Sequence, residues 1–298
     1  MCLIDDKSID MIFCDLPYGT TQAKWDSIIP LNILWEQYNR IIKDNGAIIL
    51  FGTQPFTSLL IMSNIKMFKY CWVWDKNKPT NFLNAKKQPL RSTEDICVFY
   101  NKQPTYNPQL RDKEKKNIRN TKYENVSYSE LYGKTIENWG YNQGREIPID
   151  KSYPINLIRF INMGNNNVKR LHPTQKPLEL IEYLIKTYTN EGNLILDNCC
   201  GSGSTLVGAI NLNRNYIGFE LDKKYYNIAN NRLNNIKLVR ERINMNNYLE
   251  CNYCKKKFTH DDYTICECNN IWCSDLCATK DGYKQDKNLK VTCDYCKL

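Results

Sequence analysis

One segment, residues 193–220, constrains the fold more than any other part of the chain. Its first five residues are mostly apolar and end in Asp197, and the turn Cys-Cys-Gly-Ser-Gly-Ser follows. A helix is expected from about Thr205, and a second apolar stretch, residues 216–220, ends in Glu220. A Gly-rich turn between a strand and a helix lets the backbone approach a ligand closely, and an acid after the next strand can bind both hydroxyls of a ribose. The segment therefore predicts an α/β domain that binds a nucleoside-containing cofactor.

The glycines of this turn argue against a dinucleotide as the cofactor. Gly201 and Gly203 match the first two positions of the dinucleotide fingerprint, but Leu206 stands where the third glycine is required. The start of the helix is therefore not shaped for a pyrophosphate. S-adenosylmethionine has no phosphate, so it does not need the missing glycine.

Expected strands and helices also alternate between residues 10 and 100, and a further helix is expected near residue 177. Pro177 suits the start of a helix with a buried apolar stripe, because proline is favoured in the first turn. The rhythm predicts a Rossmann-like, doubly wound α/β sheet. We expect strands at residues 10–15, 47–51, 70–74 and 96–100, and helices at residues 31–43 and 56–65. Gly46 is expected to end the first of these helical units.

A second candidate site follows the first expected strand, in the segment Asp15-Leu16-Pro17-Tyr18-Gly19. An exocyclic amine on a nucleobase is a poor nucleophile, because its lone pair is delocalised into the ring. A carboxylate such as Asp15 and a carbonyl such as that of Leu16 can accept both amine protons and favour the nucleophilic geometry. Tyr18 can hold an extruded base by stacking. A simple tight turn is the alternative interpretation of this segment.

Four stretches together resemble the DNA amino-methyltransferase family, in its permuted group whose catalytic segment precedes the cofactor segment. They are residues 15–19, 47–56, 172–177 and 196–205, and the resemblance extends over about residues 1–235. It implies an S-adenosylmethionine-dependent methyltransferase domain at residues 1–240. Within it, about residues 101–170 are expected to form a target-recognition insert.

The resemblance also implies a role for individual residues. The catalytic segment for the target base comprises Asp15, Leu16, Pro17 and Tyr18. The residues implied for the cofactor are Asp197, Cys199, Gly201, Gly203, Ser204, Thr205 and Glu220, with Thr174 and Lys176 near its methionine end. Asn198 and Cys199 replace a common Pro-Phe of the family, and Leu16 replaces a proline whose carbonyl makes the contact.

The implied reaction is methylation of adenine N6, because cytosine-N4 members of the family usually begin the catalytic segment with serine and this chain has Asp15. A cytosine-N4 or RNA methyltransferase on the same fold is the first alternative. A non-catalytic DNA- or chromatin-binding module is the second. The net charge of +9 and the pI near 8.8 favour a polyanionic partner, here double-stranded DNA. Basic and aromatic residues interleave between residues 101 and 170, as phosphate contacts and base stacking require.

The last 48 residues hold eight of the fourteen cysteines, in four pairs. Four pairs are enough for two structural zinc ions with four thiolates each, and a segment with so little apolar content needs such metals to fold. We therefore expect a small zinc-binding domain at residues 248–298, resembling a RING or PHD finger, with a protein partner as the favoured role. Its predicted ligands are Cys251, Cys254, Cys266, Cys268, Cys273, Cys277, Cys293 and Cys296.

The compartment follows from the N-terminus and from cysteine usage. Four charged residues interrupt the first ten positions, so no secretion signal is expected, and no apolar stretch is long enough for a membrane span. Metal ligation explains the cysteines better than disulfides do in a reducing compartment. A cytoplasmic protein of a bacterium or a virus-infected cell is expected. The oligomeric state is left open, a homodimer included.

Overall fold

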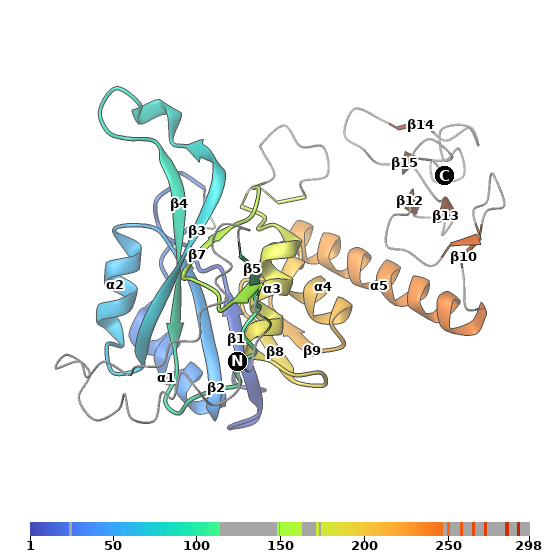
Figure 1. Cartoon of the computed structure of the whole chain (residues 1–298), viewed down its shortest axis with the longest axis horizontal. Coiled ribbons are helices and arrows are strands. Elements are labelled where there is room, and N and C mark those ends of the chain that lie inside the picture. Colours follow the sequence, from blue (N-terminus) through green and yellow to red (C-terminus); the bar gives the residue numbers. More distant parts are fainter. Residues whose placement is uncertain are drawn as a thin grey trace.

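The computed structural model describes residues 1–23, 26–113, 148, 150–162, 171–172 and 174–246, together with six two-residue strands beyond residue 248. A seven-stranded sheet with the order β7-β3-β4-β2-β1-β8-β9 forms its centre (Figure 1). The strands are β1 Ile9–Cys14, β2 Ile42–Gly52, β3 Phe68–Thr80, β4 Arg91–Phe99, β7 Leu157–Arg159, β8 Leu194–Asp197 and β9 Asn215–Gly218.

Six of these strands run in one direction and β4 runs against them. β1 pairs in parallel with β2 and β8, β8 with β9, and β3 with β7, whereas β4 is antiparallel to β2 and β3. The expected α/β sheet is confirmed, but it is mixed. The reason is local, because β3 and β4 are consecutive strands that form a hairpin, and hairpin strands are antiparallel.

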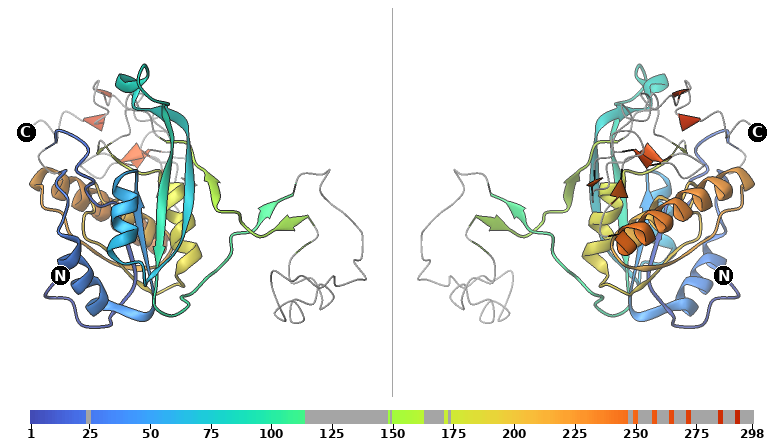
Figure 2. Two further views of the ribbon diagram at one scale, coloured as in Figure 1. Left: turned by 90° about the vertical axis from the view of Figure 1, so that its left-hand side faces the viewer. Right: turned by 90° about the vertical axis from the view of Figure 1, so that its right-hand side faces the viewer.

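Helices cover both faces of the sheet, because alternate side chains of its strands point to opposite sides. In β1, Ile12 and Cys14 pack in the cluster that contains side chains of α1 and α2, and Met11 and Phe13 pack in the cluster that contains those of α3. Figures 1 and 2 show these layers. The helices are α1 Leu31–Ile41, α2 Phe56–Ser63, α3 Leu178–Tyr188, α4 Ser204–Asn211 and α5 Lys223–Asn246, with a short 3-10 helix η1 Phe82–Asn84.

Gly46 does not end a helix unit, as the sequence suggested, but lies inside β2. α1 ends at Ile41, and β2 starts at Ile42 instead of at residue 47. A Cβ at Gly46 would lie 2.7 Å from the Ile42 side chain and 3.0 Å from the Asp10 carbonyl oxygen. The missing side chain therefore allows β2 to approach β1 closely, which is a common reason for glycine within a strand.

The remaining short strands lie in the chain's insert and tail. They are β5 Arg111–Asp112, β6 Lys151–Ser152, β10 Leu249–Glu250, β11 Lys257–Phe258, β12 Thr264–Ile265, β13 Ile271–Trp272, β14 Lys284–Gln285 and β15 Val291–Thr292. Most of the predicted target-recognition insert, and all eight cysteines predicted to bind zinc, lie outside the described residues. Within the described part of the chain, no helix combines the length and apolar character that a membrane crossing requires.

Candidate functional site

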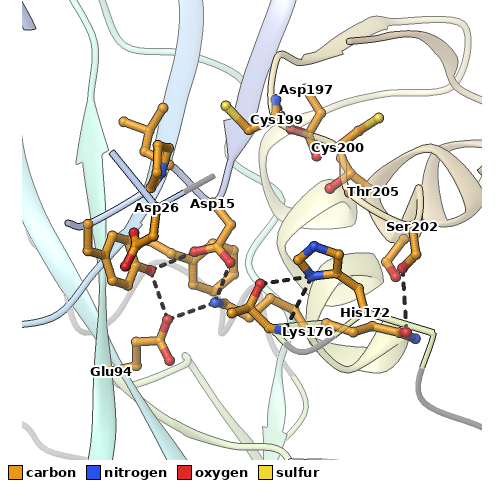
Figure 3. A pocket seen from close by; sticks show the side chains of 18 of the residues that line it. Asp15, Asp26, Glu94, His172, Lys176, Asp197, Cys199, Cys200, Ser202 and Thr205 are labelled. Atoms are coloured by element: carbon orange, nitrogen blue, oxygen red, sulfur yellow. Dashed lines mark hydrogen bonds and ion pairs between the residues drawn. The ribbon is translucent and has the colours of Figure 1, made fainter. Parts of the chain in front are cut away.

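A pocket of about 820 Å³ opens at the edge of the sheet where β1 and β8 end. These two strands are parallel neighbours, with Met11 opposite Ile195, so Asp15 and Asp197 emerge at the same edge. The pocket is lined by nearly all of the residues that the sequence predicted for the base and for the cofactor: Asp15, Leu16, Pro17, Tyr18, Thr174, Lys176, Asp197, Cys199, Gly201, Ser204, Thr205 and Glu220. Two segments almost 180 residues apart thus form one cavity (Figure 3).

Tyr18 is held in the pocket by a ring contact and by two acids. Its ring stacks on Phe56 with the centroids 5.1 Å apart and an angle of 28° between the planes. Its hydroxyl lies 2.6 Å from Asp15 Oδ1 and 3.0 Å from Glu94 Oε1. Burial, followed by the nearby charge of Asp15, raises the pKa of Tyr18 well above its usual value. The hydroxyl therefore stays protonated, and its single proton can serve only one of the two carboxylates at a time.

Lys176 joins the same two carboxylates (Figure 3). Its Nζ donates to Asp15 Oδ2 at 2.7 Å and lies 2.9 Å from Glu94 Oε1, with only 10% of the side chain exposed. Burial acts to lower the pKa of Lys176, but the attraction of Asp15 and Glu94 outweighs it and raises the pKa. The ammonium is therefore charged at neutral pH. It also lies 4.8 Å from the centre of the Phe51 ring.

The pKa of Asp15 is raised, first by burial and then by Glu94, although Lys176 opposes the shift. A second lysine, Lys76, lies 3.9 Å from Glu94 Oε2 and is almost fully buried. Two carboxylates and two ammonium groups thus share one region of the pocket, and their charges balance. Such a buried network is costly to disrupt, because removing one member leaves an unpaired charge.

Asp26 fixes the loop that follows Tyr18. Its carboxylate accepts hydrogen bonds from the backbone N–H groups of Gly19, Thr20 and Thr21 at 2.9, 3.0 and 2.7 Å. Burial opposes its ionisation, but a hydrogen bond from the Thr21 side chain and these backbone bonds together lower the pKa of Asp26 below the usual value. Gly19 has a φ of +67°, which favours glycine, so the chain can turn sharply after Tyr18.

The Gly-rich turn forms the other half of the pocket. Gly201 and Gly203 have φ values of +53° and +79°, and Gly203 precedes the first residue of α4. Glu220 accepts hydrogen bonds from the backbone N–H groups of Gly201 and Asp222, both at 2.8 Å. These two bonds orient its carboxylate. β9 ends at Gly218, two residues earlier than predicted, so Glu220 follows the strand and does not end it. Gly203 is not among the residues that line the pocket but packs against α5, where a Cβ would lie 3.0 Å from Ala229 Cβ.

The segment before α3 connects the two halves. His172 Nδ1 and Thr174 Oγ1 lie 3.0 Å apart, and the imidazole packs against the Tyr225 ring with centroids 4.1 Å apart. Gln175 Oε1 accepts a hydrogen bond from the backbone N–H of Leu171 at 2.9 Å. His172 is therefore engaged in holding the segment, and Lys176 reaches from it to Asp15.

Three residues of this site were not identified from the sequence: Glu94, Lys76 and Asp26. The one signal for Glu94 was its position as an acid just before the strand expected at residues 96–100. Its position opposite Trp74, however, depends on the pairing of β3 with β4. Among the described residues, no group of three or more histidines, cysteines or acids is placed to hold a metal ion.

The buried carboxylate of Asp197 lowers the free energy of unfolding, and this effect can be measured. Its side chain is 3% exposed, and burial raises its pKa to about 6. Because the folded state binds the proton more tightly than the unfolded state, this group lowers stability above pH 6 and does so less as the pH falls. We expect Asp197→Asn to raise the free energy of unfolding by about 1 to 3 kcal/mol at pH 8 and by about half as much at pH 5. Urea unfolding of both proteins at the two pH values checks this, and a variant less stable than wild type at pH 8 contradicts it.

The fold is an α/β sheet whose pocket lies at the carboxyl ends of its parallel strands, where open α/β sheets bind ligands. The chain belongs to the N6/N4 DNA methylase family, whose model matches residues 9–231. It is therefore a DNA methyltransferase of that family.

Two curated relatives agree with this assignment, and a solved structure shares the fold. The chain is 25% identical over 249 residues to the type II methyltransferase M1.MboII of Moraxella bovis, covering 79% of this chain and 93% of the relative. It is 28% identical over 264 residues to M2.MboI of the same species, covering 79% of this chain and 84% of the relative. The PvuII DNA methyltransferase (cytosine-N4-specific) has the same fold, with a TM-score of 0.50, 15% identity, and coverage of 78% of this chain and 88% of that one.

Proposed function

We propose that this chain transfers a methyl group from S-adenosylmethionine to N6 of an adenine flipped out of double-stranded DNA. The observation that carries the proposal is the joint pocket, which Asp15 and Tyr18 line together with Gly201 and Glu220. Family membership supports methyl transfer to a base amine in DNA. Aspartate at position 15 favours adenine, because the cytosine-N4 members of the family usually have serine at that position.

The Gly-rich half of the pocket fits S-adenosylmethionine. Gly201 presents its backbone to the cavity, and a Cβ there would point at the His172 ring, 3.5 Å away. Glu220 is oriented by two backbone N–H groups and retains the acceptor capacity to bind both ribose hydroxyls. When bound, S-adenosylmethionine supplies an electrophilic methyl group on a positively charged sulfur. Asp197 and Thr205 are the further side chains that would surround it, and Thr174 and Lys176 would lie near its methionine end, as the family resemblance implies.

The base half would hold and activate the amine. Tyr18, backed by Phe56, offers a flat surface for the flipped base. Asp15 would accept one amine proton in a hydrogen bond and the Leu16 carbonyl the other, which draws the nitrogen toward the pyramidal geometry in which its lone pair is free. After the nitrogen has taken the methyl group it must lose a proton. Asp15 suits that role because burial raises its pKa, while the hydrogen bond from Lys176 favours its ionised form beforehand.

A labelled-methyl assay tests the proposal. Purified chain is incubated with mixed-sequence duplex DNA and S-adenosylmethionine that carries a radioactive methyl group. We expect label to enter the DNA, and to be released by nuclease and not by protease. No label in DNA would refute the proposed activity and would favour the alternative of a non-catalytic DNA-binding module.

We also propose that residues 248–298 form a separate zinc-binding domain that docks a protein partner. The support is the sequence, since four cysteine pairs in the last 48 residues match two tetrathiolate sites. Zinc analysis of the purified chain should give about two ions per chain. A chain without bound zinc would remove this proposal and leave the methyltransferase assignment unchanged.

A further inference from the structure

The hairpin of β3 and β4 extends past the end of the neighbouring strand. β2 ends at Gly52, which pairs with Asp95, and β7 pairs with β3 only as far as Asp75. Residues 76–93, here called the β3–β4 arm, therefore project beyond the sheet at the edge where Asp15 lies (Figures 1 and 2). The direction of the strands explains this position, because β3 runs parallel to β1 and ends at the same edge.

The arm carries positive charge and no negative charge. Its eighteen residues contain five basic side chains and no acid: Lys76, Lys78, Lys86, Lys87 and Arg91. All of them except Lys76 are exposed. A surface of a single sign, on a protein with a net charge of +9, attracts a polyanion and is salt-sensitive.

The tip of the arm holds two apolar side chains in solvent. Phe82 is 65% exposed and Leu83 is 100% exposed. The turn that carries them is fixed by backbone hydrogen bonds from Asn84 to Asn81 and from Ala85 to Phe82, both 3.1 Å, and by a 2.8 Å bond between the Asn84 and Asn81 side chains. A single exposed hydrophobic residue needs no explanation. Two adjacent ones on an ordered turn, flanked by lysines, match the apolar wedges that DNA-bending proteins insert between base steps.

The base of the arm belongs to the pocket. Lys76, Thr80 and Arg91 line the same cavity as Tyr18 and Asp15. Arg91 lies three residues from Glu94 along β4, a distance of about 10 Å in a strand. DNA bound along the arm would thus have a base within reach of the pocket.

We propose that the β3–β4 arm grips the target duplex. Its exposed basic residues neutralise phosphates beside the target base, and Phe82 and Leu83 enter the stack where the flipped base leaves a gap. This inference rests on the proposed function, in which the base is flipped from duplex DNA. It adds a DNA-contacting element outside the predicted insert at residues 101–170.

The phosphate contacts are tested by the salt dependence of binding, which needs no methyl transfer and no recognised sequence. A mixed-sequence duplex of about 30 base pairs is titrated with wild type, Lys86→Ala/Lys87→Ala and the control Lys66→Ala/Lys69→Ala at several salt concentrations. The control lysines lie at the other end of β3. We expect the slope of log affinity against log salt to become shallower by up to about 1.8 in the arm variant, at about 0.9 per lost contact, and to stay unchanged in the control. Equal slopes for all three proteins overturn the proposal, as does a wild type that does not bind the duplex.

The wedge is tested by methyl transfer to two duplexes that contain a site methylated by the wild type. In one the target base is paired, and in the other it faces an abasic position. We expect Phe82→Ala/Leu83→Ala to lower the rate on the paired duplex by about tenfold or more and on the abasic one by less than about threefold, because an unpaired base costs less to flip. Met62→Ala/Ile65→Ala is the control, since these side chains are 70% and 55% exposed but lie outside the arm. An equal loss on both duplexes, or no loss, contradicts the wedge.

Failure of the arm proposal can be told apart from failure of the proposed function. If wild type methylates DNA and the arm variants behave like their controls, the arm proposal fails alone. If wild type transfers no methyl group, the proposed function fails, the wedge falls with it, and the salt slopes still decide whether the arm contacts phosphates.

Discussion

Asp15→Ala is expected to lower kcat for methyl transfer by at least about 10³-fold, with a much smaller effect on KM for DNA. The alanine removes the acceptor for one amine proton and the group that takes the departing proton, while Tyr18 and Phe56 remain to hold the base. The loss should therefore appear in the chemical step and not in binding. Steady-state rates over a range of DNA concentrations separate the two effects.

Two further variants control this result. Asp15→Asn keeps the shape of the side chain but has a single acceptor oxygen and an NH₂ group, so it should be nearly as inactive as the alanine variant. Asp44→Ala removes an exposed acid that pairs with Lys7 and Lys102 at a distance from the pocket, and it should keep normal activity. An Asp15→Ala protein that is correctly folded and retains more than about a tenth of the wild-type kcat would refute the role given to Asp15.

Lys176→Met is expected to destabilise the folded chain by about 3 to 5 kcal/mol at pH 8 and by clearly less at pH 5.5. Without the ammonium, Asp15 and Glu94 face each other across the Tyr18 hydroxyl, whose one proton can serve only one of them. One carboxylate then takes up a proton at a pH well above its usual pKa. The folded variant binds more protons than the unfolded one, so its stability falls as the pH rises.

Urea unfolding at the two pH values measures this effect, and Lys176→Met/Glu94→Gln serves as the matched control. Removing the second charge should restore part of the stability lost at pH 8, because it ends the repulsion between the two buried carboxylates. The recovery should be incomplete, since Lys76 then loses its partner Glu94. Activity should not return, since Asp15 still lacks its cation. A loss of stability that is the same at pH 8 and pH 5.5 would show that Lys176 contributes by packing and not by charge.

The sequence predicted the two halves of the site because each follows a strand within a local pattern. Asp15 and Asp197 both follow buried apolar runs, and parallel strands bring such residues to one edge. Glu94 could not be predicted in the same way. Its place depends on a hairpin that reverses β4 and on the register that sets Trp74 opposite Glu94, and neither is encoded near residue 94.

The structure also differs from the sequence-based predictions at Lys176 and Gly46, because of the length of the lysine side chain and the lack of a Cβ in glycine. Lys176 was expected only near the cofactor, but its long side chain reaches Asp15 in the base half of the same pocket. Gly46 was interpreted as a helix stop, yet its missing Cβ allows two strands to approach. The β3–β4 arm was not singled out, because five basic residues in a polar stretch are also typical of a solvated loop, and only the fold brings them to the pocket.

Analysis of the methylated nucleosides tests the central proposal most directly. Mixed-sequence DNA is incubated with the chain and S-adenosylmethionine, digested to nucleosides and analysed by mass spectrometry, with Asp15→Ala in parallel. We expect N6-methyladenine from wild type and none above background from the variant. N4-methylcytosine without N6-methyladenine would contradict the assignment of adenine, and N6-methyladenine from both proteins would contradict the site.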